Sequence, residues 1–292
     1  MKKKFRMTLA ILLVALLGLV IWQIISPGEP EPVYQGRPLS FWLANAAEPV
    51  IDIENPKPTL HQAMRAMGTN SVPALLRMLR ANDPAWKLKL IALGQKQNLI
   101  KIEHVPASEL NYRAALGFEQ LGTDASNTVP TLIKLYQQTS SEDSRRYIAQ
   151  SLGAIGPSAK TAVSELVKDI YTTNAALFCL VIYALGEIHS EPTLALPPLI
   201  NCLSDPQPVR RAQAASALGQ FGAEAKPAVP ALIQLLQDPN SSVNNAARDA
   251  LKTIDVKPKK RPELHNQSVV LRSPRFTAED FFSSLPLRNS FL

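Results

Sequence analysis

The sequence predicts an all-α fold, in which an α-solenoid of stacked helix pairs follows one N-terminal transmembrane helix. Three observations lead to this prediction. Leucines recur every 33 residues in the second half of the chain, each within an apolar stripe of helical spacing. Prolines and Asp-Pro pairs mark where the segments between these leucines begin and end. A cluster of cations at the N-terminus precedes a long apolar run.

The N-terminal segment "MKKKFRMTLAILLVALLGLVIWQII" predicts a membrane anchor. Its apolar run from Thr8 to Ile25 spans about 27 Å as a helix, close to the thickness of a bilayer core. We expect a cytoplasmic basic flank at residues 1–6 and a transmembrane signal anchor at residues 7–25, with the repeats outside the cytoplasm, either periplasmic or exterior. A cleaved signal peptide is the main alternative, although the residues after the run are bulkier than a cleavage site requires. A buried core helix is the third interpretation.

A proline-rich linker at residues 26–58 follows the anchor. Proline at this density holds the chain extended and disfavours regular structure. Within the linker, "PLSFWLANAA" predicts one short helix near residues 39–47, with Ser40 as its N-cap. The apolar residues of this helix, Trp42 among them, need a surface, so we expect the segment to dock on the first repeat.

Residues 59–256 predict the solenoid itself, with about five repeats and a capping half-repeat. Each repeat joins an apolar helical stripe, a glycine or polar turn, and a second helix with proline in its first turn. Two such helices cannot bury their stripes alone, but they share a continuous core when repeats stack. The register is set by Leu152, Leu185, Leu218 and Leu251 in the first helices, and by Pro130, Ser164, Pro197 and Pro230 at the openings of the second helices.

The distribution of charge argues against nucleic-acid binding. The 292-residue chain is 46% hydrophobic, enough for a buried core, and its net charge is +7. Residues 1–6 and 257–292 carry +4 each, which leaves −1 for residues 7–256. A nucleic-acid binder is expected to show a basic face on its fold, so this function stays only as an alternative. We expect the basic tail at residues 257–292 to be flexible, with a docking peptide as the other interpretation.

The segment "AVPALIQLLQDPNSSVNNAARDALKTI" resembles a HEAT repeat, in the short bacterial form also labelled phycobilisome-lyase-like, and the likeness extends over residues 59–256. With the "VYQGRPLSFWL" segment and the anchor, the chain is similar to membrane-anchored bacterial HEAT proteins of uncharacterised role. The resemblance implies a right-handed α-solenoid of helix pairs and a scaffolding function, and it transfers no catalytic residue. It also implies Asp–Arg pairs between repeats. Asp205 and Arg210 fit that pattern, but Asn244 replaces the base after Asp238, so a continuous series is not expected.

The histidines argue against an enzyme. Some HEAT-type proteins are di-iron hydroxylases with paired His-Glu steps, but here no histidine is followed by glutamate. The histidines are His61, His104, His189 and His265. We therefore expect no metal site, no cofactor and no catalytic residue, since phosphate-binding glycine loops and nucleophile motifs are lacking too. His189 falls at a turn position held by glycine in other repeats. An accessory subunit of an enzyme, lyase-like or cofactor-handling, remains the alternative function.

The two cysteines allow a possible disulfide. Cys179 lies eleven residues before Ser190 and Cys202 twelve residues after it, which places them at similar heights in an antiparallel helical hairpin. An exported domain is oxidised, but a bond still requires Cα atoms within about 7 Å and converging side chains. Buried free thiols that pack as small hydrophobes are the other interpretation.

Candidate partner-binding residues come from the second helices, which line the concave side in HEAT-like stacks. Counting four and seven positions beyond each opening residue gives two rows that fall between apolar positions. The first row is Arg77, Lys134, Lys168, Asn201 and Gln234, and the second is Arg80, Gln137, Tyr171, Ser204 and Gln237. A solvated face without a ligand is one interpretation. The other is a groove for an acidic or extended segment of an unknown protein partner, with Tyr171 as its anchor. These features predict a non-catalytic protein-interaction scaffold tethered to a membrane.

Overall fold

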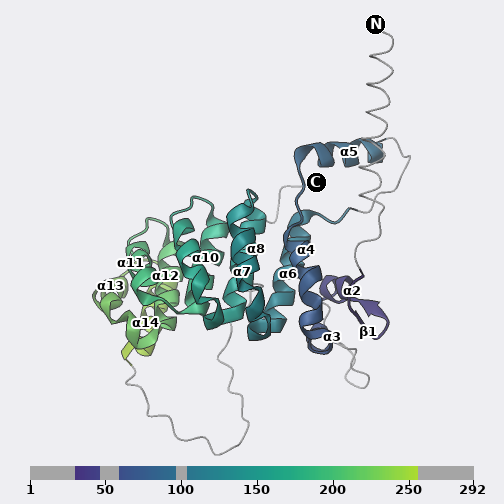
Figure 1. Ribbon diagram of the computed structural model, residues 1–292. Coiled ribbons are helices and arrows are strands. Elements are labelled where there is room, and N and C mark those ends of the chain that lie inside the picture. Colours follow the sequence, from purple (N-terminus) through teal and green to yellow (C-terminus); the bar gives the residue numbers. More distant parts are fainter. Residues whose placement is uncertain (1–29, 47–58, 97–103, 256–292) are drawn as a thin grey trace, which may run out of the picture. The chain divides into compact units, whose positions relative to one another are not determined.

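The computed structural model describes residues 30–46, 59–96 and 104–255 (Figure 1). The predicted anchor at residues 7–25 and the tail at 257–292 lie outside the described residues. Among the residues that are described, no helix is both long and apolar enough to cross a membrane. The elements, in chain order, are β1 (Val33–Tyr34), β2 (Arg37–Pro38), α2 (Leu39–Ala44), α3 (Leu60–Met67), η1 (Gly68–Ser71), α4 (Val72–Leu79), α5 (Ala85–Lys96), α6 (Ala107–Leu121), η2 (Gly122–Thr128), α7 (Val129–Gln138), α8 (Glu142–Ile155), η3 (Gly156–Ala162), α9 (Val163–Leu166), η4 (Val167–Asp169), α10 (Ala175–Ile188), α11 (Pro192–Cys202), α12 (Pro208–Gln220), η5 (Gly222–Ala228), α13 (Val229–Leu235) and α14 (Ser241–Asp255), where η denotes a 3₁₀ helix.

The hairpin β1–β2 and helix α2 form a clasp at the start of the repeats. Gln35 and Gly36 both have positive φ, 49° and 73°, as a two-residue turn between antiparallel strands requires. Leu39, Trp42 and Leu43 are buried, and α2 packs against α3 and α6. The short helix thus covers the apolar surface of the first helices with its own apolar side.

The N-cap of α2 differs from the sequence prediction. The helix begins at Leu39, one residue before Ser40, so the Ser40 hydroxyl does not occupy the cap position. The carboxylate of Glu31 instead accepts a hydrogen bond from the Ser40 N–H at 2.8 Å, an arrangement that suits the positive end of a helix. Trp42 Nε1 donates to the Arg37 carbonyl oxygen at 3.3 Å, which ties the hairpin to the helix.

Helix pairs account for the remaining elements except α5. We call α3, α6, α8, α10 and α12 the first helices and α4, α7, α9 with η4, α11 and α13 the second helices; α14 follows as a single last helix. Neighbouring first helices from α6 onward pack directly on one another, and α12 packs on α14. Each second helix also packs against the first helix of the following unit, such as α7 against α8. Figure 1 shows α6, α8, α10, α12 and α14 following one another in sequence order.

The core follows the register that the leucines predict. Leu152, Leu185 and Leu218 are at most 1% exposed, whereas Leu251 in α14 is partly exposed because no further repeat covers it. Helix α14 presents polar side chains, including Arg248, to solvent. A polar outer face is what a terminal repeat needs to stay soluble.

Glycines in the first helices let neighbouring helices approach closely. A Cβ atom on Gly153 would lie 2.8 Å from the Cα of Ala184, a distance that real Cβ atoms essentially never show. The same close approach recurs in the next two helix pairs. A Cβ atom on Gly186 would lie 3.2 Å from the Cα of Ala217, and one on Gly219 would lie 3.0 Å from the Cα of Ala250. The spacing of these glycines is therefore a packing requirement of the array.

Most pairs turn through a 3₁₀ helix that begins at a glycine of positive φ. Gly68, Gly122 and Gly156 combine φ between 53° and 72° with ψ between −146° and −129°. This combination is almost restricted to glycine, because a side chain would collide with the backbone. Gly222, with φ of 55°, begins the corresponding 3₁₀ helix of the last pair.

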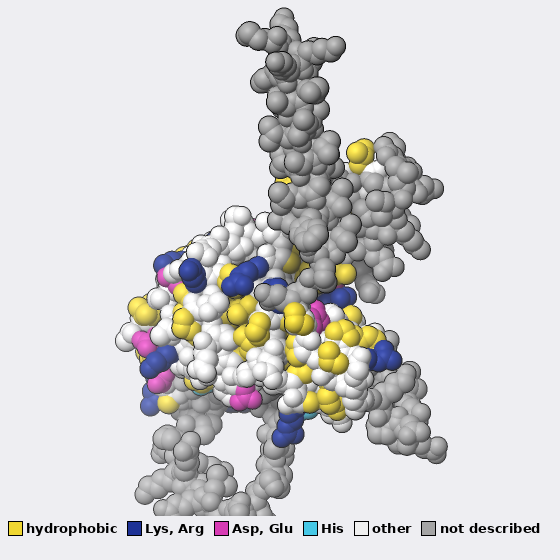
Figure 2. Space-filling model, turned by 45° about the vertical axis from the view of Figure 1, so that its right-hand side comes forward, with side chains coloured by type: hydrophobic (Ala, Val, Ile, Leu, Met, Phe, Trp, Pro, Cys, Tyr) yellow, Lys and Arg dark blue, Asp and Glu magenta, His cyan; other side chains and the backbone are white. Residues whose placement is uncertain are grey.

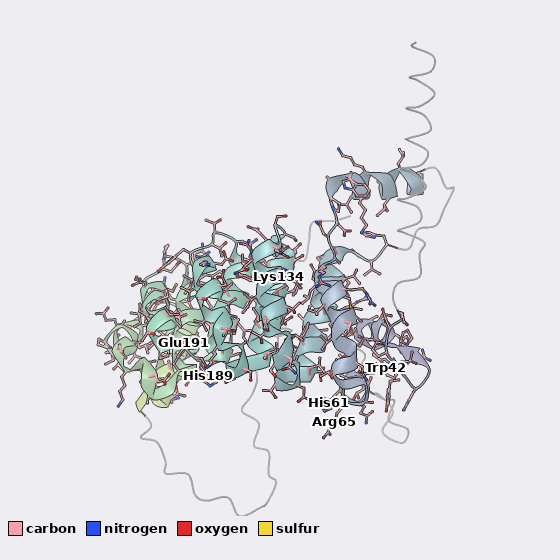
Figure 3. All side chains as sticks on the ribbon, in the orientation of Figure 1. Trp42, His61, Arg65, Lys134, His189 and Glu191 are labelled. Carbon is pink, nitrogen blue, oxygen red and sulfur yellow. The ribbon has the colours of Figure 1, made fainter. Side chains whose placement is uncertain are left out.

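The pair α10–α11 turns differently, because His189 replaces the glycine. His189 adopts φ 31° and ψ 44°, the left-handed region that side chains can enter, and Glu191 is also left-handed with φ 54° (Figure 3). The different ψ sends the chain in another direction, so α11 begins at Pro192 without a preceding 3₁₀ helix in this pair. The prediction that Pro197 opens the second helix is therefore wrong, since Pro197 lies inside α11.

Cys179 on α10 and Cys202 at the end of α11 are both free and buried, so the disulfide that their spacing allows is not formed in the structure. Gln213 of α12 acts to lower the pKa of Cys179, but burial outweighs it. Burial raises the pKa of both thiols, to about 11 for Cys202. The two thiols are accordingly protonated at neutral pH and act as small core residues.

Candidate functional site

The second helices present a series of polar side chains at matching positions, which we call the second-helix ladder. On α7, for example, Leu132 and Tyr136 are buried while Lys134 between them is exposed. The same alternation of buried and exposed positions repeats on the other second helices, where buried residues such as Leu199 and Leu232 precede the exposed Asn201 and Gln234. The ladder comprises Arg77, Arg80, Lys134, Gln137, Lys168, Tyr171, Asn201, Ser204, Gln234 and Gln237, all exposed except Arg77, which is half-buried. Arg80, Tyr171, Ser204 and Gln237 lie one or two residues beyond the ends of these helices.

The cations of the ladder differ in how far their charge is compensated. Lys168 Nζ lies 2.8 Å from Glu165, and this hydrogen bond is the main reason why the pKa of the Glu165 carboxyl is lowered. Gln137 of the preceding pair also acts to lower the pKa of Glu165. Arg80 and Lys134 are exposed, and neither forms an ion pair within the described ranges; Figure 3 labels Lys134. The uncompensated positive charge of the ladder therefore lies toward its N-terminal end.

Tyr171 is the aromatic member of the ladder. Its side chain is 63% exposed, although aromatic side chains usually lose more of their surface to packing. Asn201 Nδ2 donates to the Tyr171 hydroxyl at 3.5 Å across the junction between two pairs. Ile233, one position before Gln234, is 53% exposed as well. The ladder thus offers apolar surface beside amide and hydroxyl groups.

The face of the molecule in Figure 2 is mixed in character. Hydrophobic side chains lie between well-separated Lys and Arg side chains, with a smaller number of acidic side chains. On this face, the described residues form no continuous basic stripe of the kind that a phosphate backbone would require.

An ion pair fixes the backbone that carries Tyr171. Arg145 Nη1 on α8 lies 3.3 Å from the Asp169 carboxylate, and the Tyr136 hydroxyl of the preceding pair donates to the same group at 2.6 Å. Burial, followed by the hydrogen bond to Asp169, raises the pKa of Tyr136. Asp169 stands two residues before Tyr171, so these contacts hold the end of the second helix in place.

The Asp–Arg pair implied by the resemblance is present. Arg210 Nη1 lies 3.6 Å from Asp205, and Arg210 Nη2 donates to the Thr172 carbonyl oxygen at 2.6 Å. The guanidinium carbon is 4.2 Å from the centroid of the Phe178 ring. Arg210 is 9% exposed, and its charge is balanced by this set of contacts.

The next junction uses a residue that the sequence interpretation missed. Arg211, from the same unit as Asp238, lies 2.8 Å from its carboxylate and donates a second hydrogen bond at 3.1 Å. Hydrogen bonding from Arg211 is the main reason why the pKa of Asp238 is lowered. Asn244, at the expected position of the base, donates to the Leu236 carbonyl oxygen instead. The available signal was that Arg211 lies two repeat periods after Arg145, which makes the equivalent contact.

The histidines within the described residues lie apart and serve local contacts. His61 Nδ1 is 3.0 Å from the Gln120 side chain, and His189 Nδ1 donates to the Glu187 carbonyl oxygen at 2.9 Å. His104 Nε2 lies 3.2 Å from Asp83. In the described ranges, no three His, Cys, Asp or Glu side chains are grouped so that they could hold a metal ion.

A comparison with protein families agrees with a repeat architecture for part of the chain. Residues 172–252, from just before α10 into α14, match the family described as HEAT repeats. No curated protein matches the chain. Among solved structures, the crystal structure of importin beta in a polyethylene glycol condition is similar, with a TM-score of 0.46 and 19% sequence identity. The similarity covers 74% of this chain and 30% of importin beta, so the chain spans less than a third of that protein's length.

Proposed function

We propose that this chain, with HEAT repeats at residues 172–252, is a non-catalytic scaffold that binds a protein partner along the second-helix ladder. The observation that carries the proposal is the ladder itself, in which exposed side chains recur at one register on successive second helices. A solenoid buries its apolar stripes between repeats and leaves such a series free for recognition.

The chemistry of the ladder favours an extended segment with acidic residues. Arg80 and Lys134 supply uncompensated positive charge, and Tyr171 supplies a large, rigid surface of the kind that dominates binding interfaces. The side-chain amides of Asn201 and Gln234 can both donate to and accept from a peptide backbone. An extended partner would therefore place its acidic part at the N-terminal rungs.

The proposal includes a membrane tether, and its support is the sequence of residues 1–25. The cations at residues 1–6 favour a cytoplasmic N-terminus, with the repeats on the other side of the membrane. The similarity to membrane-anchored bacterial HEAT proteins belongs to this proposal as well.

Site-specific photocrosslinking in intact cells tests the binding face. A photoreactive residue at position 171 is expected to give a defined adduct, whereas one at Ser216, exposed on first helix α12, is expected to give none. The adduct should disappear when Arg80→Glu and Lys134→Glu are combined, while the melting temperature stays within a degree or two. Lys168 is left unchanged because its pairing with Glu165 would confuse binding with stability.

A matched control is Lys226→Glu, which reverses an exposed lysine in the 3₁₀ helix η5, away from the ladder. This variant should keep the adduct at position 171. An adduct that survives the Arg80→Glu, Lys134→Glu variant would place the partner elsewhere, and the clasp would become the next surface to test.

A further inference from the structure

Helix α5 is an insertion between two helix pairs. Its residues, Ala85–Lys96, separate α4 from α6 in the sequence, yet α4 packs directly against α6. The stack therefore continues across this point without α5. A helix that the array does not need for its own continuity requires another explanation.

The apolar side chains of α5 are unusually exposed. Trp86 is 55% exposed, Leu88 45% and Leu93 56%, so three of the large hydrophobic residues that face solvent in the described part of the chain fall on this one helix. At 100° per residue, Trp86 and Leu93 lie within about 20° of each other, whereas Leu88 lies about 160° away from that line. A helix with apolar residues on two sides is normally covered.

The charge of α5 has one sign. Lys87 and Lys89 flank the side that carries Trp86 and Leu93, and residues 85–96 contain no Asp or Glu. On the helical projection Lys89 lies about 60° to one side of Trp86 and Lys87 about 100° to the other. Lys87 is paired with Asp83, so Lys89 is the flanking lysine that can meet an anionic lipid surface, because a lysine stem can lie along the acyl region while its ammonium group reaches the headgroups.

Asp83 closes the base of the insertion. Its carboxylate accepts hydrogen bonds from Lys87 Nζ at 2.7 Å and from the Ala107 N–H at 2.6 Å, and it lies 3.2 Å from His104 Nε2. Burial raises the pKa of Asp83, but the hydrogen bonds from Lys87 and Ala107 outweigh it and leave the pKa lowered. The start of α5 and the start of α6 are thus joined through one carboxylate.

We infer that α5 lies in the headgroup region of an anionic membrane, with Trp86 and Leu93 directed into the lipid and Lys89 at the phosphate level. The choice of membrane rests on the proposed tether, which brings the chain to a bilayer. The features of α5 itself, exposed tryptophan and leucine beside the exposed Lys89, are those of a helix that lies at a lipid interface.

Depth measurements with spin labels test the inference on the full chain. Single cysteines replace Leu93, Leu88 or Val209 in a Cys179→Ala, Cys202→Ala background, and each labelled chain is reconstituted in vesicles of phosphatidylcholine and phosphatidylglycerol. Val209 is the matched control, an apolar residue 53% exposed on α12. The label at 93 should show a several-fold higher ratio of oxygen to nickel-chelate collisions than the label at 209, and the label at 88 should lie between them.

The lipid preference supplies a second readout. Lys89→Glu, or vesicles of phosphatidylcholine alone, should return the label at 93 toward the value at 209. An aqueous label at 93, or spin–spin broadening that shows a second copy on α5, would overturn the inference. A label that is deeper at 88 than at 93 would overturn the assigned face.

Alkaline carbonate extraction of the same vesicles separates this inference from the tether. A chain that resists extraction but keeps the label at 93 in water has an anchor and no lipid contact through α5. A chain that is washed off after the label had reported lipid lacks the anchor but retains the contact through α5. If the chain resists extraction and the label reports lipid, both proposals stand.

Discussion

His189 shows how one side chain redirects a turn. Glycines at the equivalent positions combine positive φ with ψ near −140°, and a histidine cannot follow them there without collision. His189 takes the left-handed helical region instead, where its N–H still closes on the Leu185 carbonyl oxygen at 3.0 Å. The start of α11 five residues before Pro197 follows from this one substitution.

The substitutions His189→Gly and Gly156→His should change the free energy of unfolding in opposite directions. His189→Gly removes a left-handed side chain, which costs about 1–2 kcal/mol, and adds glycine's backbone entropy of about 0.5–1 kcal/mol. We expect the free energy of unfolding to rise by about 1 kcal/mol or less. Gly156→His places a side chain in a backbone region that only glycine adopts, and it should lower the free energy of unfolding by about 1–3 kcal/mol. Chemical denaturation of both variants measures the difference, and a loss of stability in His189→Gly would contradict this account of the turn.

Leu218 on α12 represents the core that neighbouring helices share. It is fully buried, and Leu218→Ala should lower the free energy of unfolding by about 2–5 kcal/mol because a cavity opens between helices. Lys226→Ala changes an exposed side chain in η5 and should stay within about 0.5 kcal/mol. Thermal unfolding of the two variants side by side provides the measurement. Equal shifts of the melting temperature in the two variants would mean that the 33-residue register assigned to the repeats is wrong.

The Arg211–Asp238 pair should make the last junction sensitive to acid. The pKa of Asp238 is lowered in the folded chain, so the ionised pair adds to the free energy of unfolding. This contribution is complete above the ordinary carboxyl pKa of about 4 and is lost as the pH falls through the lowered pKa. Arg211→Met removes the partner that lowers this pKa. The variant should have a lower free energy of unfolding than the parent protein at pH 7, and this difference should become smaller below pH 4. Urea unfolding across this range tests the sign, and a difference that widens in acid would refute it.

The sequence predicts the helices of the array better than their ends. The 33-residue leucine register places the first helices because each leucine must be buried between two repeats. The N-terminus of α11 could not be found in the same way, since Pro197 carries the proline signal while the backbone at His189 decides the start. Ser40 was a plausible cap by residue type, but the position of Glu31 in space supplies the cap instead.

The candidate site was accessible from the sequence only in part. Periodicity locates exposed positions such as Lys134, because the positions between buried residues must face outward. Periodicity says nothing about whether a charge is compensated. The contact between Arg211 and Asp238 joins residues 27 positions apart, and only the folded path of the second helix brings them together. The exposure of α5 likewise depends on how the chain returns to α6.

At the scale of the whole molecule, the proposed tether predicts a topology. A reporter that is active only in the cytoplasm should be silent when it is fused after Asp255, because we expect the cations before Thr8 to keep the N-terminus inside. A reporter that is active only outside the cytoplasm should give signal at the same junction. Replacement of Lys2, Lys3, Lys4 and Arg6 by neutral residues should weaken this orientation. Cytoplasmic activity of the unmodified fusion would refute the topology.

The close glycine–alanine contacts between first helices determine how the array can deform. On that side neighbouring backbones already touch, at distances where one added carbon would collide, so the spacing there cannot shorten. The junctions at the ends of the second helices are held by charged side chains, such as Arg145 with Asp169, whose contacts can lengthen by small rotations. The stiffness is therefore one-sided. When force is applied to its ends, the array is expected to bend about the first-helix side, where the spacing stays constant. The second helices, and with them the rungs of the ladder, then move apart.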